Sequence, residues 1–264
     1  MPRRRCFSGR ADLDNMDIRA IAFDVNGTLV DIITDEGMEE IFRAVGHFLT
    51  YQGIDLRRNQ VRDLYFQIMK DQLKASREAH PEFDAVAIWR KIVTDHMTDY
   101  TRSLPAENVT QLPLVLAEMY RGISRRRLRP YPYVIEVLDA LRKRLPLAIV
   151  TDAQSAYARA ELNKAGLLDY FHPIIVSGDY GYRKPDKRLF QMAIERLGVR
   201  PEHMLYVGND MHRDVYGASR AGMHTVMYDS DQGEKTYPGA VPDYTITDYR
   251  DLLRVLDLPP LSAG

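Results

Sequence analysis

Asp24 lies near the end of an apolar run, within the stretch Ile21 to Asp31, which reads IAFDVNGTLVD. A carboxylate at the end of a buried strand can attack an electrophilic phosphorus or carbon atom and form a covalent intermediate. Gly27 would let backbone N–H groups approach an anionic group closely, and Thr28 would help to hold the turn. Asn26 lies where a second carboxylate would be useful, but an amide has no proton that titrates near neutral pH.

Polar side chains also follow three later apolar runs. Thr151 and Asp152 end the second run, Lys184 follows the third, Asp210 ends the fourth, and Asp214 follows it. In an open parallel sheet, ligands bind beyond the carboxyl ends of the strands. A lysine offsets the repulsion between a carboxylate nucleophile and a phosphate, a hydroxyl donates a hydrogen bond, and carboxylate oxygens bind Mg²⁺. These residues therefore predict a site for an anionic substrate at one edge of a sheet.

The elements that must position these residues are short apolar runs separated by helical patterns. The runs lie at 18–25, 145–152, 173–179, 203–210, 224–229 and 243–248. The first four are nearly continuous in apolar residues, which is typical of strands that are buried on both faces. Helical patterns alternate with them from about residue 130 onward, including one that runs into Gly198. We therefore predict an α/β fold with a Rossmann-like parallel sheet covered by helices.

Residues 34–127 have a different pattern, with helical periodicity and little sign of strands. We interpret them as a helical cap inserted after the first strand, so that the core consists of residues 16–33 and 128–264. Residues 1–15 are predicted to be a flexible tail. The basic stretch RRRLRP, residues 125–130, is predicted to be a solvated helix end where cap and core join, or else a patch that attracts an anionic substrate.

The overall composition of the chain excludes several classes of protein. It has 264 residues, of which 45% are hydrophobic and 28% charged, with a net charge of −1 and a single cysteine, Cys6. This charge does not favour binding to nucleic acid or to an anionic membrane, and one cysteine cannot form an internal disulfide. No apolar run is long enough to span a bilayer, and the first residues lack the apolar core of a secretory signal. We expect a cytoplasmic protein with a small-molecule substrate, and the oligomeric state is left open.

The polar segments together resemble the motifs of the haloacid dehalogenase-like hydrolases. FDVNGTLVD is similar to the first motif of that family, Asp-x-Asp-Gly-Thr, and VGNDMHRDVYGASRAGM is similar to the fourth. Thr151 in IVTDAQ and Lys184 in GYRKPD match the second and third motifs. The resemblance covers the sheet domain almost completely. It implies a Rossmann-like core, and the helical insertion resembles the family's mobile C1 cap in its position and character.

The resemblance also implies a role for each residue and a requirement for Mg²⁺. Family phosphatases use the second Asp of the first motif as general acid and base, and they bind the metal through its backbone carbonyl, which Asn26 retains. The residues implied in catalysis are Asp24, Asn26, Thr151 and Lys184; those implied in substrate binding are Gly27, Thr28 and Asp152; and those implied in binding Mg²⁺ are Asp24, Asn26, Asp210 and Asp214.

The fourth motif departs from the commonest family pattern, which has Asp directly after Gly. Asn209 takes that place when the residues are counted back from DVYGA, and Asp210 takes it when the motif is shifted by one residue. Because Mg²⁺ prefers anionic oxygen ligands, we predict that Asp210 binds the metal directly or through water. We expect Asp214 to orient a metal-bound water or Lys184.

Three functions follow from Asn26. The first is a Mg²⁺-dependent phosphatase that acts on a small phosphorylated metabolite through an aspartyl-phosphate, either slowly or with an acid borrowed from the cap. The second is a 2-haloacid dehalogenase, since halide leaves without a proton; Arg57 and Arg58 lie in the region where such enzymes carry a halide-binding arginine. The third is a binding or regulatory relative with impaired catalysis, although the retention of Asp24, Thr151 and Lys184 argues against complete loss of activity.

Overall fold

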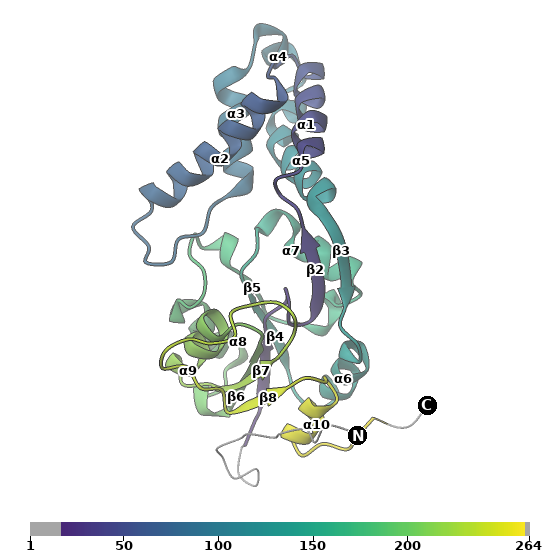
Figure 1. Cartoon of the computed structure of the whole chain (residues 1–264), viewed down its shortest axis with the longest axis vertical. Coiled ribbons are helices and arrows are strands. Elements are labelled where there is room, and N and C mark those ends of the chain that lie inside the picture. The colour runs from purple at the N-terminus through teal and green to yellow at the C-terminus, as the bar shows by residue number, and fades with distance from the viewer. Residues whose placement is uncertain (1–16, 262–264) are drawn as a thin grey trace.

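The computed structural model describes residues 17–261 of the chain. It has a sheet covered by helices at one end and a group of helices at the other, and two long strands join these parts (Figure 1). The predicted tail, residues 1–15, and the single cysteine lie outside the described residues. None of the helices within residues 17–261 has the length and apolar character needed to cross a membrane.

The main sheet has six strands, and every neighbouring pair is parallel. This arrangement confirms the predicted α/β fold. The first strand along the chain lies inside the sheet, between the strands that precede the second and fourth motifs, so the predicted site residues meet at one edge. In spatial order the strands are β5 (Ile174–Val176), β4 (Leu147–Thr151), β1 (Ala20–Phe23), β6 (Met204–Gly208), β7 (His224–Tyr228) and β8 (Tyr244–Ile246).

Both faces of this sheet are covered, which explains why its strands are apolar throughout. Successive side chains of a strand point to opposite faces. Ile21 and Phe23 belong to one apolar cluster, whereas Ala20 and Ala22 belong to another on the opposite face. The covering helices and short helical turns are α6 (Val134–Leu141), α7 (Ser155–Lys164), η2 (Leu168–Tyr170), η3 (Ser177–Asp179), α8 (Lys187–Leu197), η4 (Pro201–His203), η5 (Met211–Tyr216), α9 (Gly217–Arg220) and α10 (Asp251–Val255).

The helical insertion has an apolar core of its own. Tyr65, Trp89 and Tyr120 pack together at its centre, and the rings of Tyr65 and Tyr120 are stacked with centroids 4.6 Å apart. Its helices are α1 (Glu39–Tyr51), α2 (Arg58–Ala75), α3 (Ala85–His96), α4 (Asp99–Ser103) and α5 (Ala106–Ser124). We refer to these helices and their connecting loops as the cap. The exact boundaries 34–127 remain a prediction.

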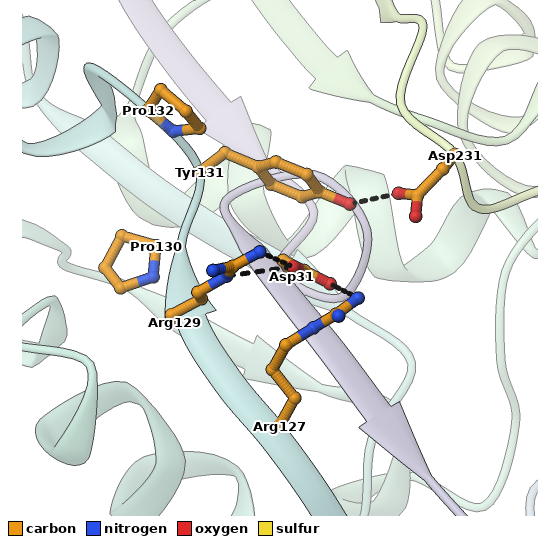
Figure 2. Close-up of a pocket in the computed structure, with 7 residues that line it drawn as sticks. All are labelled: Asp31, Arg127, Arg129, Pro130, Tyr131, Pro132 and Asp231. Atoms are coloured by element: carbon orange, nitrogen blue, oxygen red, sulfur yellow. Dashed lines mark hydrogen bonds and ion pairs between the residues drawn. The ribbon is translucent and has the colours of Figure 1, made fainter.

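The basic stretch 125–130 is not the helix end that we predicted. It forms strand β3 (Arg125–Pro130), which pairs antiparallel with β2 (Val30–Thr34) and joins the cap to the core. Figure 2 shows the carboxylate of Asp31 between the guanidinium groups of Arg127 and Arg129, at distances of 2.7 and 3.1 Å. The strand forms because β2 pairs with it and the buried Asp31 balances two of its charges. Neither partner is visible in the sequence of the stretch itself.

Candidate active site

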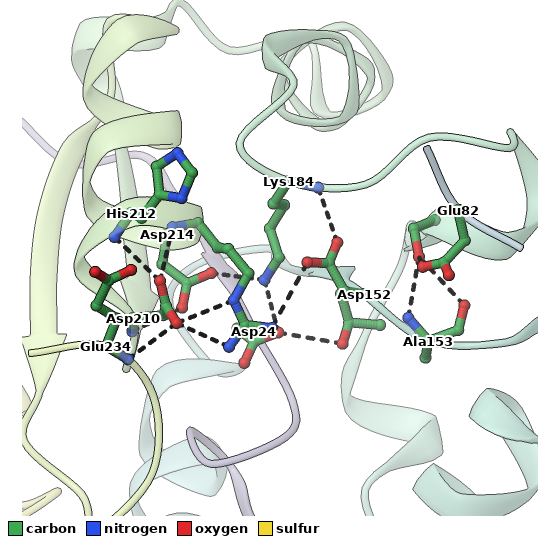
Figure 3. A network of polar contacts seen from close by, with 12 residues as sticks. Asp24, Glu82, Asp152, Ala153, Lys184, Asp210, His212, Asp214 and Glu234 are labelled. Carbon is green, nitrogen blue, oxygen red and sulfur yellow. Dashed lines mark hydrogen bonds and ion pairs between the residues drawn. The ribbon is translucent and has the colours of Figure 1, made fainter. Parts of the chain in front are cut away.

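Asp24 follows β1 directly, and it is almost completely buried. Its Oδ1 accepts hydrogen bonds from Lys184 Nζ at 2.7 Å and from Thr151 Oγ1 at 3.2 Å. Its Oδ2 accepts a hydrogen bond from Thr28 Oγ1 at 3.1 Å. The structure therefore brings the residues of the first three motifs together around one carboxylate, as Figure 3 shows for Asp24 and Lys184.

The turn after β1 is tight and is fixed by its own backbone. The amides of Gly27 and Leu29 donate to the carbonyls of Val30 and Val25 at 2.9 Å. Gly27 has a φ of +79°, and a Cβ atom there would overlap the side-chain amide of Asn209. Glycine is thus required at this position both by the backbone conformation and by the close approach of Asn209.

Lys184 connects two carboxylates in the buried part of the site. Its Nζ donates to Asp214 Oδ1 at 2.6 Å as well as to Asp24, and it lies 3.1 Å from the hydroxyl of Tyr206. Burial alone would lower the pKa of Lys184, but Asp214 and Asp24 raise it well above the usual value. Burial raises the pKa of Asp214 to about 6, and Lys184 opposes this rise. Both groups are therefore charged near neutral pH.

The two oxygens of Asp214 are occupied by four donors, including the backbone amides of Asn209 and Asp210 at 3.0 and 3.1 Å. Asp214 thus orients both Lys184 and the backbone of the fourth motif. The role of Asp214 in catalysis and its effect on a metal-bound water remain predictions.

The carboxylate of Asp210 is engaged by donors other than those around Asp24. Its carboxylate accepts five hydrogen bonds, from the backbone amides of His212, Arg213 and Glu234 and from two side-chain nitrogens of Arg213. Burial alone would raise the pKa of Asp210, but these backbone amides and the guanidinium lower it below the usual value. The metal contact that we predicted for Asp210 remains a prediction, and it would require some of these bonds to break.

Asn209, rather than Asp210, faces the nucleophile's turn. Its Oδ1 lies 3.0 Å from Thr28 Oγ1, the same hydroxyl that bonds to Asp24 Oδ2. Two side-chain oxygens, one from Asp24 and one from Asn209, are consequently neighbours at this edge of the sheet. This geometry matches the count back from DVYGA, which puts Asn209 in the place of the Asp that directly follows Gly in the commonest family pattern.

A cleft of about 330 Å³ lies between the cap and the core, next to this cluster. Asn26 lines it from the core, as do Asp152 and Arg213, whereas Glu82 and Arg121 line it from the cap. Arg57 and Arg58 do not line this cleft; they line a separate groove on the cap, where Arg58 pairs with Glu39. The cleft therefore offers both cationic and acidic side chains to a substrate near Asp24.

Only one carboxylate oxygen of Asp152 accepts a hydrogen bond from the described residues. Its Oδ1 accepts a hydrogen bond from the backbone amide of Lys184 at 2.9 Å (Figure 3). Its Oδ2 is buried and accepts no hydrogen bond from the described residues, and the nearest cation is Arg213 Nη1 at 3.9 Å. Burial raises the pKa of Asp152, and this effect is opposed chiefly by Lys184.

A loop of the cap, residues 76–84, packs against the core loop that carries Lys184. The amide of Arg183 donates to the carbonyl of His80 at 2.9 Å, and the amide of Glu82 donates to the carbonyl of Gly181 at 3.0 Å. Glu82 Oε2 accepts a hydrogen bond from Ser177 Oγ at 2.7 Å. These contacts place the carboxyl group of Glu82 in the wall of the cleft.

A second link between cap and core is the ion pair between Arg121 on α5 and Glu161 on α7. The guanidinium makes two hydrogen bonds to the carboxylate, at 2.7 and 2.9 Å, and both side chains are largely buried. Sequence reasoning identified neither this pair nor Glu82, because nothing in their local sequence distinguishes them from other charged residues on helices and loops.

Three comparisons with known proteins agree with this geometry. The model of the haloacid dehalogenase-like hydrolase family matches residues 18–222. A glyceraldehyde 3-phosphate phosphatase of Methanopyrus kandleri is 29% identical over 243 residues, which cover 90% of this chain and 97% of that protein. Among solved structures, a 2-haloacid dehalogenase from Pseudomonas syringae pv. Tomato DC3000 has a TM-score of 0.65 and 21% identity, covering 91% of this chain and 98% of that one. At that identity the likeness shows the fold alone.

A second solved structure, a HAD phosphatase from Thermococcus onnurineus, has a TM-score of 0.59 and 25% identity. It covers 90% of this chain and 98% of that one. The relatives therefore include both phosphatases and dehalogenases on the same fold, so the chemistry must be argued from the site itself.

Proposed function

Because the chain belongs to the haloacid dehalogenase-like hydrolase family, we propose that it is a phosphatase for a small phosphomonoester. The observation that carries this proposal is the buried carboxylate of Asp24, which Lys184 and Thr151 hold below a cleft that also contains arginines. The similarity to a glyceraldehyde 3-phosphate phosphatase over nearly the whole length of both chains supports it.

In this mechanism the carboxylate of Asp24 attacks the phosphorus atom and forms an aspartyl-phosphate, which water then hydrolyses. Lys184 offsets the negative charge of the nucleophile and of the phosphoryl group, which would otherwise repel each other. Asp214 keeps Lys184 in place, since their nitrogen and oxygen atoms are 2.6 Å apart. Thr151 donates a hydrogen bond that fixes the orientation of the nucleophile.

The oxygen atoms around Asp24 fit a Mg²⁺ ion that keeps several of its waters. Mg²⁺ takes oxygen ligands and commonly binds proteins through one or two carboxylates. Within residues 17–261 there is no group of three acidic, histidine or cysteine side chains placed to hold a metal. We infer that Asp24, the Asn26 carbonyl and the Asn209 amide oxygen would hold the ion, because Asp210 is engaged elsewhere. When bound, the ion would polarise the phosphoryl oxygens as a Lewis acid.

The dehalogenase alternative has one observation in its favour, which is the amide of Asn26 in place of an acid. Against it, the two arginines that the sequence offered for halide binding lie outside the cleft. Arg121 is already committed to Glu161, and Arg213 to Asp210. A purely binding role is opposed by the intact set of Asp24, Thr151 and Lys184.

Phosphate release from a panel of small alkyl and aryl phosphomonoesters, with and without Mg²⁺, tests the proposal against halide release from 2-haloacids. We expect Mg²⁺-dependent phosphate release and no halide release. An Asp24→Asn variant, compared in the same assay, shows whether any activity belongs to this site. Halide release without phosphate release would replace the proposal by the dehalogenase alternative, and neither product would favour the binding role.

A further inference from the structure

The cleft contains an acid whose environment differs from that of its neighbours. Three acidic residues line the cleft, namely Glu36, Glu82 and Asp152. Glu36 is about half exposed and lies 3.8 Å from Arg121. Both oxygens of Glu82 accept hydrogen bonds, from Ser177 on one side and from Phe83 and Gln154 on the other. Asp152 is therefore the acid of this cleft whose buried Oδ2 has no hydrogen-bond donor among the described residues.

Asp152 is also tied to the nucleophile through two neighbours. Lys184 holds both carboxylates, since its backbone amide donates to Asp152 Oδ1 at 2.9 Å and its Nζ donates to Asp24 Oδ1 at 2.7 Å. Thr151, which precedes Asp152 in the chain, donates to the same oxygen of Asp24. The orientation of Asp152 is thus fixed relative to Asp24, and Asp152 lines the same cleft as Asn26.

We propose that Asp152 is the proton donor and acceptor of this enzyme, and that it replaces the carboxyl group that Asn26 lacks. This inference rests on the proposed phosphatase function. Asn26 and Asp152 line one cleft, and they follow the ends of neighbouring strands, β1 and β4, which pair directly. A carboxyl group with one oxygen fixed and the other free can hold a proton and release it towards the cleft.

The proton balance of the reaction is as follows. Asp24 bonds to phosphorus, the bond between phosphorus and the leaving oxygen breaks, and the proton of Asp152 moves to that leaving oxygen. In the second half, the carboxylate of Asp152 takes a proton from water. The water oxygen then bonds to phosphorus as the bond to Asp24 breaks. The products are an alcohol and inorganic phosphate, and Asp152 recovers its proton.

The surroundings of Asp152 favour the protonated form that the first half needs. Burial raises its pKa, and the negative charge of Asp24 acts in the same direction, whereas Lys184 and Arg213 act against it. From the cap, Glu82 is the acid that interacts with Asp152, and each of the two disfavours the charge of the other. Activity that requires protonated Asp152 should fall as the pH rises through this raised pKa.

The test compares Asp152→Asn with Glu82→Gln as the matched control, because both remove an acid from the same cleft. The turnover number is measured at saturating Mg²⁺ on an alkyl phosphate and on nitrophenyl phosphate, whose leaving group needs no proton. For Asp152→Asn we expect a loss on the order of 10²-fold on the alkyl phosphate and less than about 10-fold on the aryl phosphate. Glu82→Gln should change both turnover numbers by the same factor.

Rescue provides a readout that a purely structural role would not give. Adding Asn26→Asp to Asp152→Asn should raise the turnover number on the alkyl phosphate at least about 10-fold above that of Asp152→Asn alone, because a carboxyl group returns to the cleft. Should Asp152→Asn fail to fold, Asp152→Ser is measured in its place. The wild-type pH profile on the alkyl phosphate should lose activity on the alkaline side sooner than the profile on the aryl phosphate.

Two outcomes would overturn the inference alone while leaving the phosphatase function in place. One is an equal loss on both substrates for Asp152→Asn, without rescue by Asn26→Asp. The other is that Glu82→Gln, rather than Asp152→Asn, lowers the turnover number on the alkyl phosphate more than on the aryl phosphate. If the wild-type protein releases phosphate from no member of the panel, the proposed function fails, and the inference fails with it.

Discussion

The cluster around Asp24 and the wall of the cleft are both rich in acids, but their charges are partnered in different ways. In the cluster, Asp24 and Asp214 have both carboxylate oxygens hydrogen-bonded, and Lys184 lies between them. In the wall, Glu82 is bonded mainly by neutral groups, and Asp152 has a buried oxygen without a donor among the described residues. The carboxylates of the cluster are thus bonded to a shared cation, whereas the wall contains an acid that lacks a full set of donors.

This difference matches two needs of the proposed reaction. A nucleophile and its counter-charge work best when they are fixed before the substrate arrives. A group that gives and takes a proton must be able to hold that proton, and burial without a full set of donors raises the pKa of an acid and so favours its protonated form. The comparison predicts that changes in the cluster abolish activity or destabilise the fold. In the wall, a change at Asp152 should alter the dependence of activity on the leaving group, and a change at Glu82 should alter the dependence of stability on pH.

Asp24→Asn should have the largest effect, because it removes the nucleophile without changing the shape of the side chain. We expect turnover on every phosphomonoester to fall by at least about 10⁴-fold, as is usual when the nucleophile of a covalent mechanism is lost. The measurement is phosphate release, with circular dichroism to confirm the fold. If the variant retained wild-type turnover, Asp24 would not be the nucleophile.

Lys184→Met should weaken the fold as well as the activity. It leaves Asp24 and Asp214 buried beside each other without their shared cation, and breaking such a pair costs about 3–5 kcal/mol of unfolding free energy. The matched control is Lys187→Met at the exposed start of α8, where a change within about 0.5 kcal/mol is expected. Urea unfolding measures both variants, and equal midpoints would contradict the structural role assigned to Lys184.

Asn26→Asp should increase turnover by about 10-fold on alkyl phosphates and by less on aryl phosphates, since alkoxides depend more on protonation. The two side chains are nearly the same size, and the backbone carbonyl is unchanged. The added carboxylate repels Asp24, which limits the gain. Turnover numbers on one alkyl and one aryl phosphate check this expectation. A lower turnover on both substrates, in a variant that folds and binds Mg²⁺ normally, would mean that position 26 is unsuited to proton transfer.

Glu82→Gln should have the smallest effect, and it should appear in the pH dependence of stability. Burial raises the pKa of Glu82 above the usual value, although Ser177 opposes this rise. The folded protein therefore keeps this proton at pH values where the unfolded chain has lost it. The resulting contribution to stability is fully present below the unfolded pKa and is lost as the pH rises through the folded pKa.

Because the glutamine side chain of this variant cannot ionise, wild type should lose stability relative to the variant when the pH increases. We expect the unfolding free energy of the wild type to fall relative to that of the variant between about pH 5 and about pH 8. Urea unfolding of both proteins at about pH 5 and about pH 8 measures it. A wild-type protein that gained stability relative to the variant would show that the pKa of Glu82 is lowered instead.

Much of the core and of the site can be predicted from the sequence. The nearly continuous apolar runs that precede Asp24, Thr151 and Lys184 identify strands buried on both faces, and parallel strands bring their carboxyl ends to one edge. Gly27 can also be predicted from the sequence, because a tight turn between a strand end and a polar segment requires a residue that tolerates positive φ. These predictions succeed because they depend on local patterns and on one general rule of sheet geometry.

Other features depend on partners that are distant in the sequence. Residues 125–130 form a strand only because β2 pairs with them and Asp31 balances two of their arginines. In the fourth motif, the choice between Asn209 and Asp210 depends on contacts with the backbone of Glu234 and with Thr28.

The amino-acid sequence by itself determined which residues end the strands of the sheet, and hence which side chains meet around Asp24. Only the tertiary structure decided which of the acids near Asp24 are bonded to cations and which lack a full set of donors. Glu82 reaches the cleft on a loop of the cap, and Asp152 is left with a free oxygen because its described neighbours bond elsewhere. The physical reason is that the pKa of a buried carboxyl group depends on the donors and charges around it, and folding brings these from distant parts of the chain.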